Sequence, residues 1–294
     1  MPRTADPSFA DLVNDWFAHA ARPLPWRAAE ISPWAVLVSE FMLQQTQVAR
    51  VLPRWTAWLE RWPTPAALAA APPADAVRAW DRLGYPRRAL WLHEAATEIV
   101  ERHGGEVPAS IDELLALKGI GPYTARAVAA FAFGERHPVV DTNTRRVLAR
   151  AIEGRAHAGA PSTARDLAAM DAQLPLDPEA ARRFNAAAME LGATVCTART
   201  PDCGGCPVRQ RCAWVAAGCP ADETPKRRQA RYEGSDRQVR GIVLAELRAA
   251  HRPVDRAALG TRWADAEQLD RALGTLVADG LAVAGADGYT LPEA

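Results

Sequence analysis

Four cysteines placed close together constrain how this chain can fold. Cys196, Cys203, Cys206 and Cys212 have the spacing C-x6-C-x2-C-x5-C, so four thiols fall within 17 residues. In the reducing cytoplasm such a group indicates a metal site rather than disulfides. Four thiolates can hold a zinc ion or a [4Fe–4S] cluster. Zinc sites usually pair two close-spaced knuckles and only one C-x2-C is present, so the spacing favours iron–sulfur and leaves zinc open. Cys219 is expected to be a bystander.

Nearly every periodic segment of the first 215 residues has the helical period. Ser8 and Asp11 resemble a capping box, and the apolar residues that follow recur at i, i+3, i+4 and i+7. Further helices are expected around residues 34–42, 50–61, 74–83, 87–103, 111–117, 122–133, 143–153, 162–173 and 178–192. No alternating strand pattern of any length occurs before residue 280. The predicted fold class is therefore mainly α.

The C-terminal segment reads as a separate module. A linker rich in Pro, Gly and charge covers 216–234, and helical stripes follow at 239–247, near 255–259 and at 266–277. The end alternates around Asp287-Gly288, which predicts a β-hairpin. Three helices and a hairpin over 235–294 suggest a winged-helix-like module. Such modules bind DNA or proteins, so this segment does not decide function.

Composition excludes several classes of protein. The chain is 49% hydrophobic and 24% charged, the balance of an ordinary globular protein. It has no run of 18 apolar residues, so no membrane span is expected. Its start lacks the order of a signal peptide, which favours the cytoplasm. A formal net charge of zero argues against a simple basic nucleic-acid binder.

The run "KGIGPYTA", 118–125, interrupts one helical pattern and starts another. Gly119 and Gly121 permit backbone angles that other residues avoid, and Pro122 suits the first turn of a new helix. Backbone N–H groups at such a turn can bind a phosphate, and the missing side chains let a DNA backbone approach closely. An ordinary corner between helices explains the glycines equally well.

These features together resemble one family. The Leu117–Gly121 hairpin, the segment "GERHPVVD" ending at Asp141, and the cysteine spacing are similar to those of the helix-hairpin-helix DNA glycosylases related to endonuclease III, in their iron–sulfur branch. The resemblance implies a [4Fe–4S] cluster, and a loop between the first two cysteines, carrying Arg199, that lies on DNA. It implies a catalytic region over 1–215, with a six-helix barrel at about 28–133 and a cluster domain from 1–27 and 134–215.

A second set of motifs narrows the resemblance. "VSEFMLQQTQV" (Val38–Val48), "PWR" ending at Arg27, and "RLGYPRRA" (Arg82–Ala89) look like those of MutY-type adenine DNA glycosylases. The similarity covers about 8–215. It implies base excision repair of double-stranded DNA, by removal of adenine mispaired with 8-oxoguanine or guanine. The resemblance also implies that Arg27 binds DNA.

Two carboxylates could divide the work of breaking an N-glycosidic bond. Glu40 lies on an apolar helix, where desolvation raises the pKa of a carboxyl group and suits that group to protonate adenine N7. Alternatively, Glu40 is an ordinary surface glutamate on an amphipathic helix. Asp141 precedes a helix and would otherwise be an N-cap. The resemblance implies that it stabilises the cation-like sugar, and that Asn143 and Tyr123 help to arrange the site.

Adenine must leave the base stack before it can react. By resemblance, Gln44, Gln45 and Thr46 contact the duplex and Tyr85 wedges into it. Two departures from the family pattern occur: Pro86 replaces a usual tyrosine, and threonines flank Asn143 where Gly and Val are commoner.

Tyr123 stands where bifunctional relatives carry a nucleophilic lysine. A phenol cannot form a Schiff base, so the reaction should stop at the abasic site. The Nudix-like domain that usually follows in this family has no counterpart in the sequence given. Two other functions stay open: a thymine–guanine mismatch glycosylase, and a non-catalytic iron–sulfur DNA-binding regulator. The protein is expected to be a monomer associated with the nucleoid.

Overall fold

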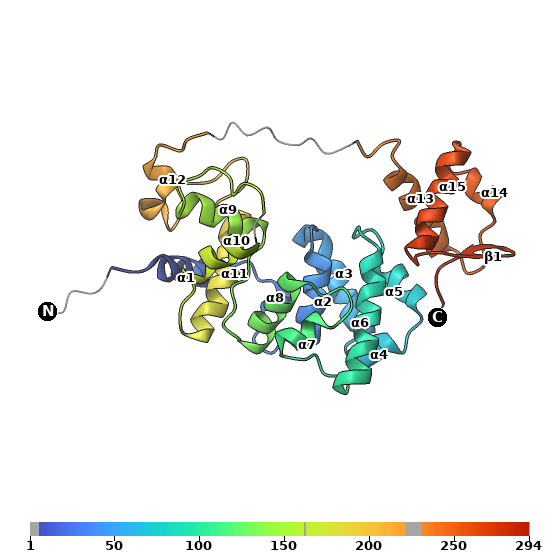
Figure 1. The fold of residues 1–294 in the computed structure, drawn as a ribbon, viewed down its shortest axis with the longest axis horizontal. Helices are drawn as coiled ribbons and strands as arrows, with labels where there is room; N and C mark the ends of the chain where they lie inside the picture. Colours follow the sequence, from blue (N-terminus) through green and yellow to red (C-terminus); the bar gives the residue numbers. More distant parts are fainter. Residues whose placement is uncertain (1–5, 162, 222–230, 294) are drawn as a thin grey trace. The chain divides into compact units, whose positions relative to one another are not determined.

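The computed structural model describes residues 6–161, 163–221 and 231–293 (Figure 1). These residues are mainly helical, as the periodicity predicts, and their two strands are three residues each. Contacts divide the chain into two compact units. Unit 1 is Met1–Val36, Ala109–Ile111 and Gly121–Pro225; unit 2 is Leu37–Pro108, Asp112–Ile120 and Lys226–Ala294. The domain boundaries expected from the sequence stay a prediction, and 222–230, inside the expected linker, lie outside the described residues.

Unit 1 is built on helices that are far apart in the sequence. α1 (Phe9–Ala20) packs against α11 (Pro178–Thr194), where the Phe9 ring meets Phe184 edge-on at 6.0 Å between centroids. The apolar stripe of each helix supplies this core. The remaining helices of the unit are α8 (Pro122–Phe133), α9 (Thr142–Ala151), α10 (Thr163–Asp171) and α12 (Ala213–Ala216), with 3-10 turns at Pro25–Arg27 and Arg209–Arg211.

Unit 2 has an aromatic core. The Trp58 ring contacts Trp62 and Trp80 edge-on, with centroids 4.7 and 5.8 Å apart, and all three side chains are buried. These tryptophans therefore serve packing. The helices that meet in this unit are α2 (Pro33–Leu43, from Leu37 on), α3 (Val48–Arg61), α4 (Pro65–Ala69), α5 (Pro73–Trp80), α6 (Arg87–His103) and α7 (Ile111–Leu115).

The predicted break at "KGIGPYTA" is a turn between α7 and α8. Gly119 has φ +75°, and a Cβ there would lie 2.7 Å from Cβ of Trp91 on α6, so only glycine fits. Gly121 is the N-cap of α8, which begins at a proline. Nothing lies within 4 Å of a Cβ built on Gly121. The first glycine is therefore required for packing, whereas the second leaves open space in front of a helix N-terminus.

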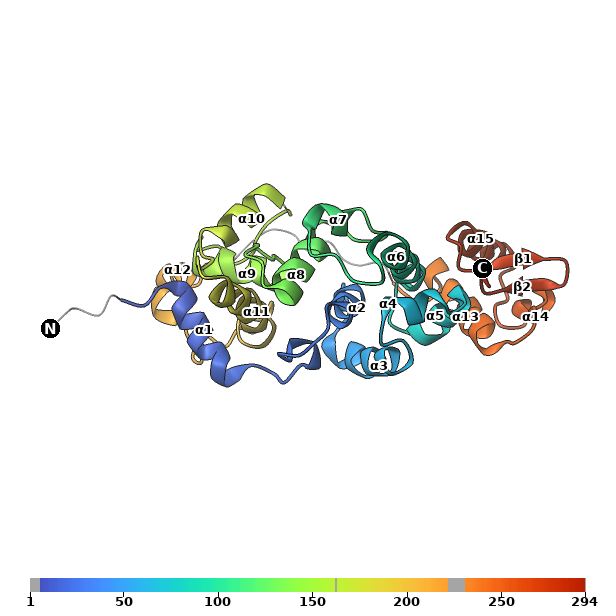
Figure 2. The ribbon, with the colours of Figure 1, turned by 90° about the horizontal axis from the view of Figure 1, so that it is seen from below.

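The C-terminal residues form three helices and a hairpin, as predicted. The hairpin pairs Val283 with Thr290 and closes at Gly285 and Gly288, and an isolated bridge joins Val254 to Tyr289. Figures 1 and 2 show α13 beside α5, within unit 2. The elements are α13 (Asp236–Ala249), α14 (Arg256–Gly260), α15 (Ala266–Ala278), β1 (Val283–Gly285) and β2 (Gly288–Thr290).

Candidate functional site

Glu40 lies on α2, a helix on which every residue from 34 to 42 is buried. Its side chain is 7% exposed. Among the described residues only two acidic side chains are buried, Glu40 and Glu190. Glu190 is held by two arginines, Arg22 at 2.6 Å and Arg27 at 2.9 Å, which gives it a structural role. Glu40 is the other buried carboxyl group, and its catalytic role stays a prediction.

Asp141 is the N-cap of α9, the role that its position favours on local grounds. Its Oδ1 accepts from the Thr144 amide at 2.7 Å, and its Oδ2 accepts from Asn143 Nδ2 at 2.8 Å. The carboxylate is half-buried. Both oxygens are thus oriented, by the start of a helix and by the Asn143 amide. The role of Asn143 in arranging the catalytic site stays a prediction.

Arg146 connects this pair to the first cysteine. Its guanidinium donates to Asn143 Oδ1 at 2.7 Å, to the Cys196 carbonyl at 2.7 Å and to the Gly192 carbonyl at 2.6 Å. Burial lowers the pKa of Arg146, while Cys196 and Asp141 oppose that shift. A Cβ on Gly192 would lie 2.7 Å from Asn143 O, so the glycine lets α11 approach α9. A continuous hydrogen-bonded chain therefore runs from Asp141 to Cys196.

Tyr123 is half-buried near the start of α8. It packs against a cluster formed by Ala127, Ala130 and Val139. Lys118, the nearby lysine, pairs with Glu94 at 3.3 Å. Tyr123 thus packs on apolar side chains, and Lys118 is engaged within unit 2.

Gln45 and Tyr85 lie on two loops of unit 2 and contact each other. Tyr85 Oη donates to Gln45 Oε1 at 2.6 Å, and both residues are exposed. Both also have left-handed backbones, with φ of 60° and 46°. Such conformations cost about 1–3 kcal/mol in a non-glycine residue and cluster at functional sites. Two such residues joined by a side-chain bond mark a candidate contact surface for a ligand.

Neighbouring residues fasten these two loops together. Thr46 Oγ1 donates to the Leu83 carbonyl at 3.3 Å. The buried Arg88 guanidinium stacks on the Tyr85 ring at 4.4 Å and donates to the carbonyl of Gln44. The sequence predictions named Gln44, Thr46 and Tyr85 but missed Arg88, because a contact across 44 residues leaves no local signal.

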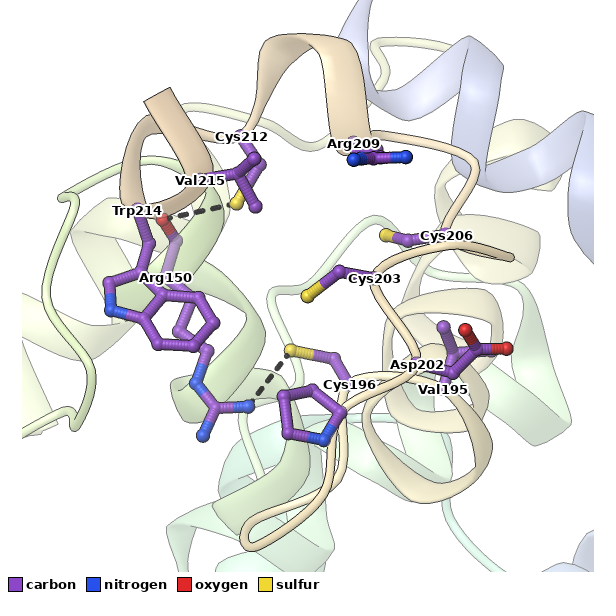
Figure 3. Close-up of a pocket in the computed structure, with 11 residues that line it drawn as sticks. Arg150, Val195, Cys196, Asp202, Cys203, Cys206, Arg209, Cys212, Trp214 and Val215 are labelled. Atoms are coloured by element: carbon purple, nitrogen blue, oxygen red, sulfur yellow. Dashed lines mark hydrogen bonds between the residues drawn. The ribbon is translucent and has the colours of Figure 1, made fainter. Parts of the chain in front are cut away.

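The four clustered cysteines line one pocket in unit 1 (Figure 3). Burial raises the pKa of Cys206 to about 11, so metal is needed to hold its thiolate form. The four thiols surround one space, and four thiolates at such a space can hold a cluster with one cysteine on each iron. Cys219 is exposed and does not line the pocket.

Arg150 is a buried arginine at the edge of this pocket that sequence reasoning missed. Its Nη1 lies 3.5 Å from Cys196 Sγ and donates to the Thr197 carbonyl at 2.7 Å. The Trp214 ring covers its guanidinium at 4.9 Å (Figure 3). Arg150 thus fixes the start of the loop between the first two cysteines, on which Arg199 is exposed.

Arg27 occupies a different setting from Arg199. Besides its bond to Glu190, its guanidinium lies 5.2 Å from the centre of the Phe17 ring, and burial lowers its pKa. These contacts give Arg27 a structural role. Its predicted contact with DNA stays a prediction.

Comparison with solved structures places the fold in a known class. A thermostable thymine-DNA glycosylase matches with a TM-score of 0.64 at 25% identity, covering 71% of this chain and 95% of that one. An endonuclease III complex with DNA matches with a TM-score of 0.61 at 23% identity, over 72% and 95%. The fold is therefore that of the helix-hairpin-helix glycosylases of the endonuclease III type.

Sequence comparison gives the family. Residues 38–168 match the HhH-GPD superfamily of base excision DNA repair proteins, and 196–212 match the iron–sulfur binding domain of endonuclease III. An adenine DNA glycosylase of Mycobacterium tuberculosis is 57% identical over 279 residues, which are 94% of this chain and 91% of the relative. A thymine/uracil-DNA glycosylase of Pyrobaculum aerophilum is 35% identical, over 71% and 92%. The chain belongs to the adenine DNA glycosylase family, and its cofactor is a [4Fe–4S] cluster.

No helix in the described part of the chain is both long and apolar enough to cross a membrane.

Proposed function

We propose that this chain removes adenine mispaired with 8-oxoguanine or guanine from double-stranded DNA and leaves an abasic site. The observation that carries this proposal is the burial of Glu40 on α2, in a chain of the adenine glycosylase family. A glutamic acid side chain in this position can donate a proton to a departing base.

Glu40 acts as the general acid. Its proton passes to N7 of the flipped adenine, the C1′–N9 bond breaks, and the bonding electron pair leaves with the base. The sugar becomes a cation-like oxocarbenium. Water then adds to C1′ and returns a proton to Glu40, so the protein ends the cycle unchanged.

Asp141 stabilises the charge on the sugar. Its two oxygens are oriented by the Thr144 amide and by Asn143, which reduces the reorganisation needed when the positive charge forms. Asn143 is itself held by Arg146. Tyr123 offers no amine, so no Schiff base with the sugar forms and the protein is monofunctional.

DNA is held by backbone and side-chain groups of several segments. The open space beside Gly121 admits a phosphate to the start of α8, and Gly119 shapes that turn. Exposed Arg199 contacts another phosphate. Gln45 and Tyr85 enter the duplex where adenine leaves it, with Gln44 and Thr46 beside them. Arg27 is also predicted to face DNA.

The pocket cysteines, Cys196, Cys203, Cys206 and Cys212, are proposed to hold the cluster. Cysteines on both sides of the loop that carries Arg199 would hold the cluster, so a bound cluster would tie the two ends of this loop together. The protein is expected to act as a monomer in the cytoplasm, on nucleoid DNA. A reducing compartment suits four thiol ligands.

A glycosylase assay on three duplexes tests the function. We expect strand cleavage by alkali after incubation with A opposite 8-oxoguanine or G, and none with T opposite G. Glu40→Gln should abolish adenine release, whereas Glu101→Gln, an exposed glutamate on α6, should not change it. Absence of adenine release from both mispairs would refute the proposal. Borohydride trapping of a protein–DNA adduct would refute the monofunctional mechanism.

Thymine release is the second candidate function. The 35% identical thymine/uracil-DNA glycosylase and the fold match to a thymine-DNA glycosylase favour it. The greater similarity to adenine glycosylases weighs against it. Cleavage of the T–G duplex alone would establish this alternative, and binding without any cleavage would indicate a DNA-binding regulator.

A further inference from the structure

The C-terminal module, residues 235–294, is poorly suited to bind DNA by itself. It carries seven arginines and no lysine against nine acidic residues. In winged-helix proteins the second helix of the helix-turn-helix reads the groove. The corresponding helix here, α15, presents Glu267 and Asp270 beside Arg271. Because the module carries more negative than positive charge, it does not favour contact with phosphates.

One contact of the module is with the end of α5. Arg248, on α13, donates from Nε to the Val77 carbonyl at 3.1 Å. The amide of Asp81, which would bond to Val77 O in a continuing helix, bonds to Arg78 O. The Val77 carbonyl near the helix end therefore accepts from Arg248 in place of its usual backbone donor. Burial lowers the pKa of Arg248, and the negative charge of Asp81 opposes this shift. The arginine thus lies close to the first residue of the loop 81–86.

A second contact is with the start of α6. Asp279, which ends α15, accepts from Arg240 at 2.6 Å inside the module and from Arg87 at 3.2 Å. A Cβ on the next residue, Gly280, would lie 3.8 Å from Leu90 Cδ1. Arg87 directly follows the loop 81–86. The module therefore touches the chain on both sides of this loop.

The loop between these contacts has an unusual backbone. Asp81, Gly84 and Tyr85 have φ of 46°, 91° and 46°. Non-glycine residues persist in such conformations only where surrounding contacts fix them. On one side these contacts come from α3 and the loop before it, through Thr46 and through Arg54, whose guanidinium pairs with Asp81. On the other side they come from the C-terminal module.

We propose that the C-terminal module is a brace for the loop 81–86, in which Arg248 and Asp279 are positioning residues that hold Tyr85 ready to enter DNA. The inference rests on the proposed function in one respect, since it takes Tyr85 as the wedge. It gives the module a task that needs no contact with nucleic acid.

Hydrogen exchange of the DNA-free protein tests the brace directly. The amides of Leu83 and Arg88 bond to Trp80 O and Tyr85 O, and their exchange reports the order of the loop. We expect exchange at both amides to rise about fivefold or more in Arg248→Ala and Asp279→Asn. Arg271→Ala, an exposed arginine of α15, should leave it unchanged. Arg248→Lys, which keeps a donor, should restore most protection. Unchanged exchange in Arg248→Ala and Asp279→Asn would overturn the proposal.

A double-mutant cycle tests the link to Tyr85. The dissociation constant for an A–8-oxoguanine duplex is measured in the non-cleaving Glu40→Gln protein. Arg248→Ala should weaken binding about fivefold to tenfold when Tyr85 is present, and less than about twofold in Tyr85→Ala. Equal effects in both backgrounds would overturn the positioning role. Absence of mispair binding by the parent protein would instead count against the proposed function, because the exchange result does not depend on DNA.

Discussion

Replacing Arg146 with alanine should damage both the stability of unit 1 and its chemistry. Three oxygens would lose their donor: Asn143 Oδ1 and the carbonyls of Cys196 and Gly192, at 2.6–2.7 Å. Hydrogen bonds to a charged group contribute about 1.5–3 kcal/mol each. Because Arg146 is only half-buried, water can replace part of this set. We expect a loss of about 2–4 kcal/mol in the free energy of unfolding, or roughly 5–15 °C in Tm.

The effect on the reaction follows from the next contact in the chain. Without Arg146 the Asn143 amide can rotate, and Asp141 Oδ2 loses an oriented donor. We expect the single-turnover rate of adenine release to fall about tenfold or more, because a catalytic carboxylate must be held closely in position. Arg146→Lys keeps the charge, but a lysine cannot reach all three acceptors. Its single-turnover rate should therefore lie between those of the alanine variant and the parent protein.

The assay pairs thermal melting with single-turnover kinetics at a temperature where every variant is folded. Arg183→Ala, an exposed arginine of α11, is the matched control and should change neither. If Arg146→Ala melts normally, the hydrogen-bond accounting is wrong. If it melts early but releases adenine at the parent rate, the link between Arg146 and Asp141 is wrong.

Further predictions concern the two hairpin glycines, the buried ion pair and the cluster. Gly119→Ala should lower the free energy of unfolding by about 2 kcal/mol or more in a denaturant titration, because the new Cβ would meet Trp91. Gly121→Ala should lower it by about 1 kcal/mol or less, yet should weaken DNA binding severalfold in a filter assay. The pKa of Glu190 lies below its ordinary value. Burial would raise this pKa, but the hydrogen bonds and charges of Arg22 and Arg27 outweigh the effect of burial. This stabilisation is present above the unfolded pKa of about 4.3 and is lost as pH falls through the depressed folded pKa, so unfolding curves should show an acid-dependent component that Glu190→Gln lacks. Cys203→Ser should lose the brown absorbance of the cluster near the visible–ultraviolet boundary, and a colourless parent protein with one zinc ion would contradict the cluster assignment.

Local patterns predicted most of the elements. The capping box of Ser8 and Asp11 is confirmed, with both reciprocal bonds present. The C-terminal hairpin and helices also form where the turn residues and the apolar stripes indicated them. The helix expected at 74–83 ends at Trp80, because Asp81 turns into a left-handed conformation that periodicity cannot reveal. α4 was missed, since five residues are too few for a stripe, although Thr64 and Pro65 were start signals.

The candidate site was predictable only in part. Motifs located Glu40 and Asp141, whose roles stay predictions. The four cysteines, which were expected from their spacing to share a site, line one pocket. The arginines that organise these groups were not foreseen. Arg88, Arg146 and Arg150 donate to backbone carbonyls far along the chain, and any residue can supply a carbonyl. Such pairings depend on the tertiary fold and leave no residue pattern behind.

The packing of α1 on α11 has a consequence for synthesis of the protein. The bond from Asn14 to the Ala180 carbonyl joins residues 166 positions apart. At about 5–20 residues per second, the ribosome makes α1 roughly 8–33 s before the helix that covers it. During that interval Phe9 and Val13, both buried in the folded protein, face water or a chaperone. The core of unit 1 can close only after α11 has emerged, so α1 reaches its final packing long after it has been made.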